Sequence, residues 1–488
     1  MCGICGEVDL LGAPDEAPVR RMARALAHRG PDAEGFFSEG PAALGHRRLS
    51  ILDLEGGVQP MVREGVTLVF NGQAYEHAEV RERLRARGHA FTTRSDTEVV
   101  LRAYLEWGER FVEELHGMFA VALWDAPRRK LLLARDRLGK KPLYYAIAQG
   151  GTWTCAPGGA ATRAVFASEL KAFAAHGGVP RELDHEALAQ YLAVEYVPAP
   201  RSIHRHVFKL PAGHLAVLDE RGFRLQRYWE LPAPSRDRIP AAEAGEELVR
   251  RLDAAVARRL VADVPVGVFL SGGIDSTTIS ALAVRHKDPL QTFSIGFTEE
   301  SFDETPFAKL ASERLGTRHS MQRLSGQDCL DLLPDAVASL DEPFADPSFL
   351  PTLLLSRFTR QTVKVALAGD GGDELFAGYT PYADALARVG SAGIQAFRRI
   401  TVPLLRPMIV FSVTISIIGT FSMFTEPYIL TRGGPIRATE TPVLQIFSTT
   451  FQDLRFGYAA AESYVYFAII VAVTLFQFWS ISRRDPVQ

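Results

Sequence analysis

The sequence contains few cysteines and no excess of charge of either sign. Four cysteines occur among 488 residues, too few for a framework of disulfide bonds to hold the fold. Lys and Arg number 54 against 57 Asp and Glu, and no long basic run is present, so the chain lacks the charge pattern of a nucleic-acid-binding protein. No leader of charged residues followed by an apolar run stands at the N-terminus. We therefore expect residues 1 to about 383 to form a cytoplasmic enzyme, in a chain of two or three domains.

Charged residues nearly vanish in two apolar stretches near the C-terminus, at 408–424 and 463–481. Each approaches the length of about 20 residues needed to cross a bilayer. A buried core helix is the alternative for each stretch, but basic residues on both outer flanks favour a membrane hairpin with its outer ends in the cytoplasm. These flanking residues are Arg398, Arg399, Arg406, Arg483 and Arg484.

Cys2 is the most informative residue for chemistry. If Met1 is removed, Cys2 carries both a thiol and a free α-amine, and the amine can take the thiol proton near neutral pH. A nucleophile and its general base then come in one residue, which suits the hydrolysis of an amide. Two alternatives remain open at this point: a cysteine at this position by chance, or redox or metal chemistry of the C-x-x-C pair formed with Cys5.

Further motifs follow in the first hundred residues: H-R-G-P-D at 28–32, H-R-R-L-S-I-L-D at 46–53, F-N-G-Q at 70–73 and S-D-T-E at 95–98. The pattern at 65–70 predicts a strand that Asn71-Gly72 ends in a turn, so that a side-chain amide and a backbone N–H could form an oxyanion hole. Arg48 could bind a substrate carboxylate, or a surface carboxylate instead. Asp96, at the start of a helical run predicted over 98–115, could accept from a substrate ammonium or cap the helix.

On these motifs, residues 1–230 resemble the class-II glutamine amidotransferase domain of bacterial asparagine synthetases, an N-terminal-nucleophile α/β/β/α sandwich. A-R-D-R-L-G-K-K-P-L-Y-Y at 134–145, F-A-S-E-L-K at 166–171, Y-V-P-A-P at 196–200 and K-L-P-A-G-H at 209–214 extend the resemblance. It implies that Cys2 attacks the glutamine amide and that Asn71 and Gly72 stabilise the oxyanion. The implied glutamine-binding residues are Arg48, Leu49, Ser50, Ile51, Leu52, Asn71, Gly72, Gln73 and Asp96. Gln73 departs from the family's usual Glu, so we expect weaker glutamine binding.

A second site is predicted at 264–286, where an apolar run of strand length, a Ser/Gly-rich loop and a helical stretch at 277–286 follow one another. Glycines let backbone N–H groups turn onto an anion, and the start of the helix favours negative charge. The loop lacks the G-K-[ST] ending of a Walker motif. Glycines and carboxylates also follow a predicted strand at 363–367, and ligands bind at such strand ends in parallel α/β sheets.

S-G-G-I-D-S at 271–276 resembles the pyrophosphate loop of ATP pyrophosphatases. Together with T-F-S-I-G-F at 292–297 and D-E-P-F-A-D-P-S at 341–348, this motif indicates that residues 240–382 resemble a partial asparagine synthetase ATP-pyrophosphatase domain. We expect Mg²⁺ on Asp275 and Asp373, the alternative for Asp373 being a helix cap. The ATP-binding residues implied are Phe269, Leu270, Ser271, Gly272, Gly273, Asp275, Ser276, Ile295, Ala368, Gly369 and Asp370.

The segment 384–488 resembles the end of a permease subunit of sugar ABC transporters, through D-A-L-x₃-G-x₉-I-x-V-P at 384–403, F-T-E-P-Y-I-L-T-R-G-G-P at 424–435 and F-G-Y-A-A-A-E-S at 456–463. The expected seam lies at 379–392. The sequence thus predicts an α/β protein that ends in a helical, transmembrane-like hairpin in the inner membrane, with the synthetase domain truncated and its activity impaired.

Together the resemblances imply a glutamine-dependent asparagine synthetase, a carbon–nitrogen ligase with glutamine, aspartate and ATP as substrates, with a homodimer as a further expectation. Two other hypotheses stay open: a transmembrane component of a sugar transporter, and a fusion chimera that retains only glutaminase activity.

Overall fold

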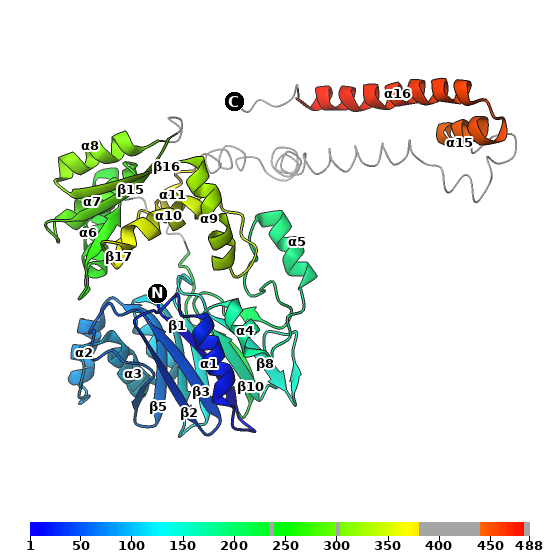
Figure 1. Cartoon of the computed structure of the whole chain (residues 1–488). Coiled ribbons are helices and arrows are strands. Elements are labelled where there is room, and N and C mark those ends of the chain that lie inside the picture. Colours follow the sequence, from blue (N-terminus) through cyan, green and yellow to red (C-terminus); the bar gives the residue numbers. More distant parts are fainter. Residues whose placement is uncertain (234–238, 299–302, 380–439, 483–488) are drawn as a thin grey trace. The chain divides into compact units, whose positions relative to one another are not determined.

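The computed structural model describes residues 1–233, 239–298, 303–379 and 440–482, the last ten of these by their backbone alone. The chain divides into two compact units, residues 1–370 and 371–488, which are described separately. The first unit contains three sheets (Figure 1). Both predicted sites in residues 1–370 therefore belong to one unit.

Two antiparallel sheets form the N-terminal part. The first has the order β11-β8-β10-β1-β3-β2, with β9 paired to β8, and the second the order β13-β12-β7-β6-β5-β4. The strands of the first are β1 (Gly3–Asp9), β2 (Ala33–Glu39), β3 (Ala42–Arg48), β8 (Tyr144–Gln149), β9 (Thr152–Trp153), β10 (Arg163–Ala167) and β11 (Phe208–Lys209). Those of the second are β4 (Met61–Arg63), β5 (Val66–Ala74), β6 (Gly117–Asp125), β7 (Lys130–Arg135), β12 (His214–Asp219) and β13 (Gly222–Arg227).

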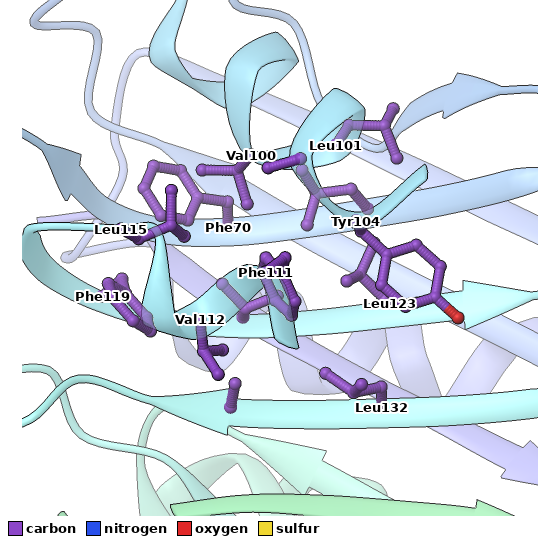
Figure 2. Close-up of a cluster of buried hydrophobic side chains, with 14 of the residues drawn as sticks. Phe70, Val100, Leu101, Tyr104, Phe111, Val112, Leu115, Phe119, Leu123 and Leu132 are labelled. Atoms are coloured by element: carbon purple, nitrogen blue, oxygen red, sulfur yellow. The ribbon is translucent and has the colours of Figure 1, made fainter. Parts of the chain in front are cut away.

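Helices cover the outer face of each sheet. Helices α1 (Glu16–Ala25) and α4 (Leu170–His176) pack on the first sheet through one buried cluster. Helices α2 (His77–Arg85) and α3 (Asp96–Trp107) pack with the 3₁₀ helix η1 (Gly108–Glu113) on the second sheet, where their apolar side chains meet those of the strands (Figure 2). A third buried cluster lies between the sheets. These layers confirm the predicted α/β/β/α sandwich.

A parallel sheet follows, with the order β16-β15-β14-β17. Its apolar cluster joins β14 to two helices, and on another side the Phe358 ring meets the Phe293 ring edge-on at 6.1 Å between centroids. The parallel sheet confirms the predicted α/β class of this part. The strands are β14 (Val266–Phe269), β15 (Gln291–Phe297), β16 (Arg318–Leu324) and β17 (Val365–Leu367). The helices are α5 (His185–Val194), which precedes this part, and α6 (Ala241–Arg259), α7 (Ile274–Val284), α8 (Thr305–Leu315), α9 (Gly326–Ser339) and α10 (Phe349–Arg360).

The turn predicted at Asn71-Gly72 is wrong, because strand β5 continues through both residues to Ala74. Glycines on both strands allow this. A Cβ on Gly72 would lie 2.2 Å from the Met118 carbonyl oxygen, and one on Gly117 would lie 2.2 Å from the Gln73 carbonyl oxygen. The paired strands therefore approach closely where a turn was expected.

Two predicted helices differ in their bounds. The helix predicted over 98–115 begins at Asp96 and ends at Trp107, where Gly108 takes a φ of +58° and a 3₁₀ helix follows. The helix predicted over 277–286 begins earlier, at Ile274, so that Asp275 and Ser276 lie in its first turn.

The second unit contains α11 (Gly372–Phe376), α15 (Pro442–Phe447), the π-helical turn η6 (Ser448–Gln452) and α16 (Phe456–Ser482). Helix α16 covers the stretch predicted at 463–481, whereas the predicted span 408–424 and nearly all of the predicted seam lie outside the described residues. Within the ranges that the structure describes, no helix combines the length and the apolar character needed to cross a membrane.

Candidate active site

Cys2 lies just before strand β1, beside the loop that follows β3. Its Sγ lies 3.4 Å from the Leu49 N–H and 3.7 Å from the Leu49 carbonyl oxygen. The Arg29 guanidinium donates from Nε to the Cys2 carbonyl oxygen at 2.9 Å. Burial raises the pKa of the Cys2 thiol, although the bond from Leu49 acts to lower it. The thiol is therefore protonated near neutral pH and needs a base before it can attack.

A cavity of about 370 Å³ opens beside Cys2. Of the predicted glutamine-binding residues, all line it except Ser50, whose backbone N–H donates to Asp32 Oδ2 at 2.7 Å. The lining residues that the sequence predicted are Cys2, Arg48, Leu49, Ile51, Leu52, Asn71, Gly72, Gln73 and Asp96.

Asn71 is the most unusual residue of the cavity. Its side chain is 1% exposed, and neither Nδ2 nor Oδ1 has a hydrogen-bond partner among the described residues. A buried amide without partners costs free energy, so such groups in native proteins call for an explanation. The Asn71 amide lines the cavity with Cys2 and is free to bind a ligand.

Asp96 is buried at the start of α3, and burial is the main cause that raises the pKa of its carboxyl group. Its Oδ2 accepts from the Ala74 N–H at 3.0 Å. The alternative of a helix N-cap is wrong, because Ser95 is the N-cap and accepts from the Thr97 N–H. Because Asp96 does not cap the helix, its carboxylate can accept a further hydrogen bond from a ligand in the cavity.

Two predicted binding residues are engaged by the protein itself. The Arg48 guanidinium donates from Nη1 to the Leu54 carbonyl oxygen at 2.7 Å and from Nη2 to the Asp53 carbonyl oxygen at 2.7 Å. Gln73 donates from Nε2 to the Val261 carbonyl oxygen at 3.0 Å. Arg48 thus fastens the loop after β3, and its contact with a substrate carboxylate stays a prediction.

Two lysines without a predicted role, Lys141 and Lys364, also line the cavity. Lys141 belongs to the G-K-K-P segment, and burial is the main cause that lowers the pKa of its ammonium to about 8. Lys364 comes from the segment just before β17. The signal for Lys141 was its place in a motif of the family, whereas nothing in the local sequence marks Lys364.

The predicted phosphate loop lies between β14 and α7. The Ser271 hydroxyl lies 2.9 Å from the Ser276 hydroxyl, and the Ser271 N–H donates to the same Ser276 Oγ at 3.2 Å. Gly272 has a φ of +87°, and a Cβ there would lie 2.5 Å from the Ala308 nitrogen. Gly273 is the N-cap of α7. The loop thus turns tightly into a helix start, the geometry that favours an anion.

The other predicted ATP-binding residues extend from neighbouring strands. Phe269 ends β14 and Leu270 follows it. Ile295 lies on β15, and Ala368, Gly369 and Asp370 follow β17. A Cβ on Gly369 would lie 2.9 Å from the Ser276 nitrogen, so the end of β17 touches the start of α7. The parallel register brings these strand ends to one edge of the sheet.

The described residues hold no group of three or more His, Cys, Asp or Glu side chains suited to a metal ion. Mg²⁺ bound with substrate phosphates needs only one or two protein carboxylates, so Asp275 in the first turn of α7 fits that role. Asp373 lies in α11 of the second unit.

Two family models match the chain. A glutamine amidotransferase domain matches residues 1–229, and asparagine synthase matches residues 247–409. The second match continues beyond residue 382, the predicted end of this part. Nothing in these matches supports the permease resemblance of the tail.

Several asparagine synthetases are similar to the chain. A Mycobacterium tuberculosis protein assigned as a glutamine-hydrolysing asparagine synthetase is 36% identical over 441 residues, 84% of this chain and 64% of its own length. Asparagine synthetase 1 of Bacillus subtilis is 35% identical, over 79% of this chain and 60% of its length. A Methanocaldococcus jannaschii protein with the same assignment as the mycobacterial one is 36% identical, over 78% of this chain and 76% of its length. The chain therefore spans less than two thirds of the first two relatives.

Among solved structures, glutamine phosphoribosylpyrophosphate amidotransferase of Bacillus subtilis matches with a TM-score of 0.35 and 16% identity, over 66% of this chain and 65% of that one. A likeness of this size says nothing about substrate.

Proposed function

Because this chain belongs to the family of glutamine-hydrolysing asparagine synthetases, we propose that it forms asparagine from aspartate, with glutamine as the source of ammonia and ATP as the source of energy. The observation that carries the proposal is the buried, unpartnered amide of Asn71 in the same cavity as Cys2. An oxyanion hole needs such a donor, held in place before the reaction and free of other bonds.

The first half-reaction takes place at Cys2. Once Met1 has been removed, the α-amine takes the thiol proton and Sγ attacks the glutamine carboxamide carbon. The Asn71 Nδ2 and the Gly72 N–H donate to the oxyanion of the tetrahedral intermediate. Its collapse breaks the C–N bond, the leaving nitrogen takes the proton from the amine, and ammonia departs. Water then attacks the thioester and releases glutamate.

Asp96 supports glutamine as the amide substrate. Its carboxylate is buried at the cavity and retains acceptor capacity beyond the bond from Ala74, which suits an α-ammonium group. Arg48, with the loop Leu49–Leu52 that it fastens, is proposed to bind the α-carboxylate. Gln73 can accept from the ammonium through its amide oxygen while its nitrogen stays bound to Val261.

The second half-reaction is proposed at the loop 271–276. The β-carboxylate of aspartate attacks the α-phosphorus of ATP, pyrophosphate leaves, and ammonia then displaces AMP from the acyl adenylate. The loop N–H groups and the start of α7 bind the pyrophosphate, and residues near Ile295 contact the adenine. Mg²⁺ held by Asp275 would neutralise phosphate charge, and the role of Asp373 as a metal ligand stays a prediction.

We propose a cytoplasmic location for residues 1–383, because the mechanism requires a free thiol at Cys2 and a reducing compartment keeps thiols free. Each of the four cysteines lies outside any disulfide bond. Insertion of the tail into the inner membrane stays a prediction.

Release of ammonia from glutamine by the full chain tests the proposal. We expect Cys2→Ala to abolish release, because no other group can form the thioester, and Cys5→Ala to retain it. Cys5 is a matched control, because its thiol is buried and lies within bonding distance of the Val19 and Gly45 carbonyl oxygens. Equal release from wild type and Cys2→Ala would refute the assignment.

A further inference from the structure

The glutamine-binding loop Leu49–Asp53 has backbone polar groups whose partners come from far along the chain. The Asp53 N–H donates to Asp263 Oδ2 at 2.7 Å, and the Ile51 carbonyl oxygen accepts from the Asp263 N–H at 2.9 Å. Asp263 lies just before β14 of the parallel sheet. Buried backbone groups need such partners, so the sheet that precedes the phosphate loop helps to fix the loop beside Cys2.

Lys364 contacts the same loop near its start, at Ser50. Its ammonium lies 2.7 Å from Asp32 Oδ2 and 3.3 Å from the Ser50 carbonyl oxygen. Asp32 Oδ2 also accepts from the Ser50 N–H, so one carboxylate oxygen joins the lysine to the loop. Burial acts to raise the pKa of Asp32, but the bonds from Lys364 and Ser50 outweigh it and the net effect is a lowered pKa. The carboxylate is therefore ionised when it binds the lysine.

Leu49 completes the connection to the nucleophile. It is the neighbour of Ser50, and both its N–H and its carbonyl oxygen face Cys2 Sγ. A displacement of Ser50 would thus move the groups that hold the thiol in place. Lys364, Val365 and Ala366 line the cavity as well, so the parallel sheet forms part of its wall.

Strand β17 connects this contact to the phosphate loop. Lys364 precedes the strand, and Gly369, close to the Ser276 nitrogen, follows it. The five residue-to-residue steps from Lys364 to Gly369 span about 17 Å of extended chain. One short strand therefore touches both proposed sites.

We propose that Lys364 is a positioning residue of the glutaminase site, which holds the loop Leu49–Asp53 against Cys2 through Asp32 and the Ser50 carbonyl group. This inference rests on the proposed function. It assigns to the ATP-binding part of the chain a direct role in glutamine binding, so the glutamine pocket is complete only when the parallel sheet is in place.

The test compares Lys364→Met with wild type and with Lys309→Met in the full chain. Lys309 is a matched control, because among the described residues its exposed side chain on α8 pairs with Glu313 alone, at 4.0 Å. We expect Lys364→Met to raise the KM for glutamine about two- to fivefold, the size typical of a partly exposed ion pair, with kcat within about twofold of wild type. Lys364→Arg, which keeps the charge, should restore most of the affinity.

Asp32→Asn should raise KM by a similar factor, and the double variant should add little to either single change. Hydrogen exchange provides a readout that does not depend on turnover. Peptides that cover residues 49–57 should exchange faster in Lys364→Met than in wild type and in Lys309→Met.

Unchanged KM, or a fall in kcat at unchanged KM, would overturn the role of Lys364, and so would unchanged exchange in the loop. If Lys364→Met does not fold, the KM values of Lys364→Arg and Asp32→Asn decide the matter in the same way. Absence of ammonia release from wild type would instead refute the proposed function, while the exchange data would still judge the contact.

Discussion

Replacement of Asn71 by leucine should abolish most glutaminase activity and at the same time stabilise the protein. Leucine has a similar size and fills the site without polar atoms. The wild-type amide is 1% exposed, and neither of its polar atoms has a partner in the described part of the chain. Nδ2, the atom that would donate to the oxyanion, and its neighbour Oδ1 therefore both cost stability in the empty cavity.

The catalytic loss follows from the missing donor. Removal of one oxyanion-hole donor typically lowers kcat about 10²- to 10³-fold, which corresponds to about 2.7–4 kcal/mol of transition-state stabilisation. The KM for glutamine should change much less, because the oxyanion develops only after the thiol attacks. The Gly72 N–H remains, so a low residual rate is expected.

The gain in stability follows from desolvation. A buried polar group without a partner costs about 1–3 kcal/mol, and its replacement by an apolar group of the same shape removes that cost. For a domain of about 150–250 residues, each kcal/mol shifts Tm by about 2–4 °C. We therefore expect Tm of Asn71→Leu, measured without glutamine, to rise by a few degrees.

Ammonia release and thermal unfolding of the same preparations test both parts. Cys2→Ala is the control, because it should lose activity without the gain in Tm. A wild-type kcat in Asn71→Leu would refute the role of Asn71 in the oxyanion hole. A fall in Tm would show that the amide makes stabilising bonds and is not held free for a ligand.

Two further predictions concern Lys141 and Gly272. Burial lowers the pKa of Lys141 to about 8, so between pH 8 and the higher pKa of this lysine in the unfolded chain the folded protein binds fewer protons and its stability rises with pH. Lys141→Met should therefore raise Tm at pH 7 by an amount that shrinks toward pH 10. A Tm difference that does not depend on pH would contradict this prediction. Gly272→Ala should lower asparagine formation at least tenfold and leave glutamine hydrolysis intact, because a side chain at a φ of +87° is strained and its Cβ would lie 2.5 Å from the Ala308 nitrogen. Normal pyrophosphate release by this variant would count against the phosphate loop.

Local patterns in the sequence predicted the phosphate loop well. A strand, a glycine-rich turn and a helix stand in that order at 264–286, and each follows from residues next to one another in the chain. The strand predicted over 292–297 is likewise confirmed as β15. Such elements depend on apolar periodicity and turn residues, which a single sequence contains.

The turn at Asn71-Gly72 was wrong because the same dipeptide fits a turn or a closely packed strand. The choice depends on Gly117 of the neighbouring strand, 45 residues later, and local sequence does not reveal that pairing. The place of Lys364 at the cavity could not be predicted for the same reason, since its partner Asp32 lies 332 residues away in the sequence. Contacts over such distances exist only in the folded chain.

Three groups at the cavity share a property that supports the proposed binding of an amino-acid amide. The Asn71 amide has no partner among the residues that the structure describes, the carboxyl group of Asp96 has a raised pKa and the ammonium of Lys141 has a lowered pKa, so each is poorly compensated in the free protein. In the proposed assignment the glutamine amide meets Asn71 and the ammonium meets Asp96, while Lys141 adds positive charge to the cavity in which Arg48 is proposed to bind the carboxylate. Burial of uncompensated polar groups is selected against unless a ligand uses them. The cost in stability is therefore itself an argument for glutamine, and variants that relieve it should lose glutamine turnover as they gain stability.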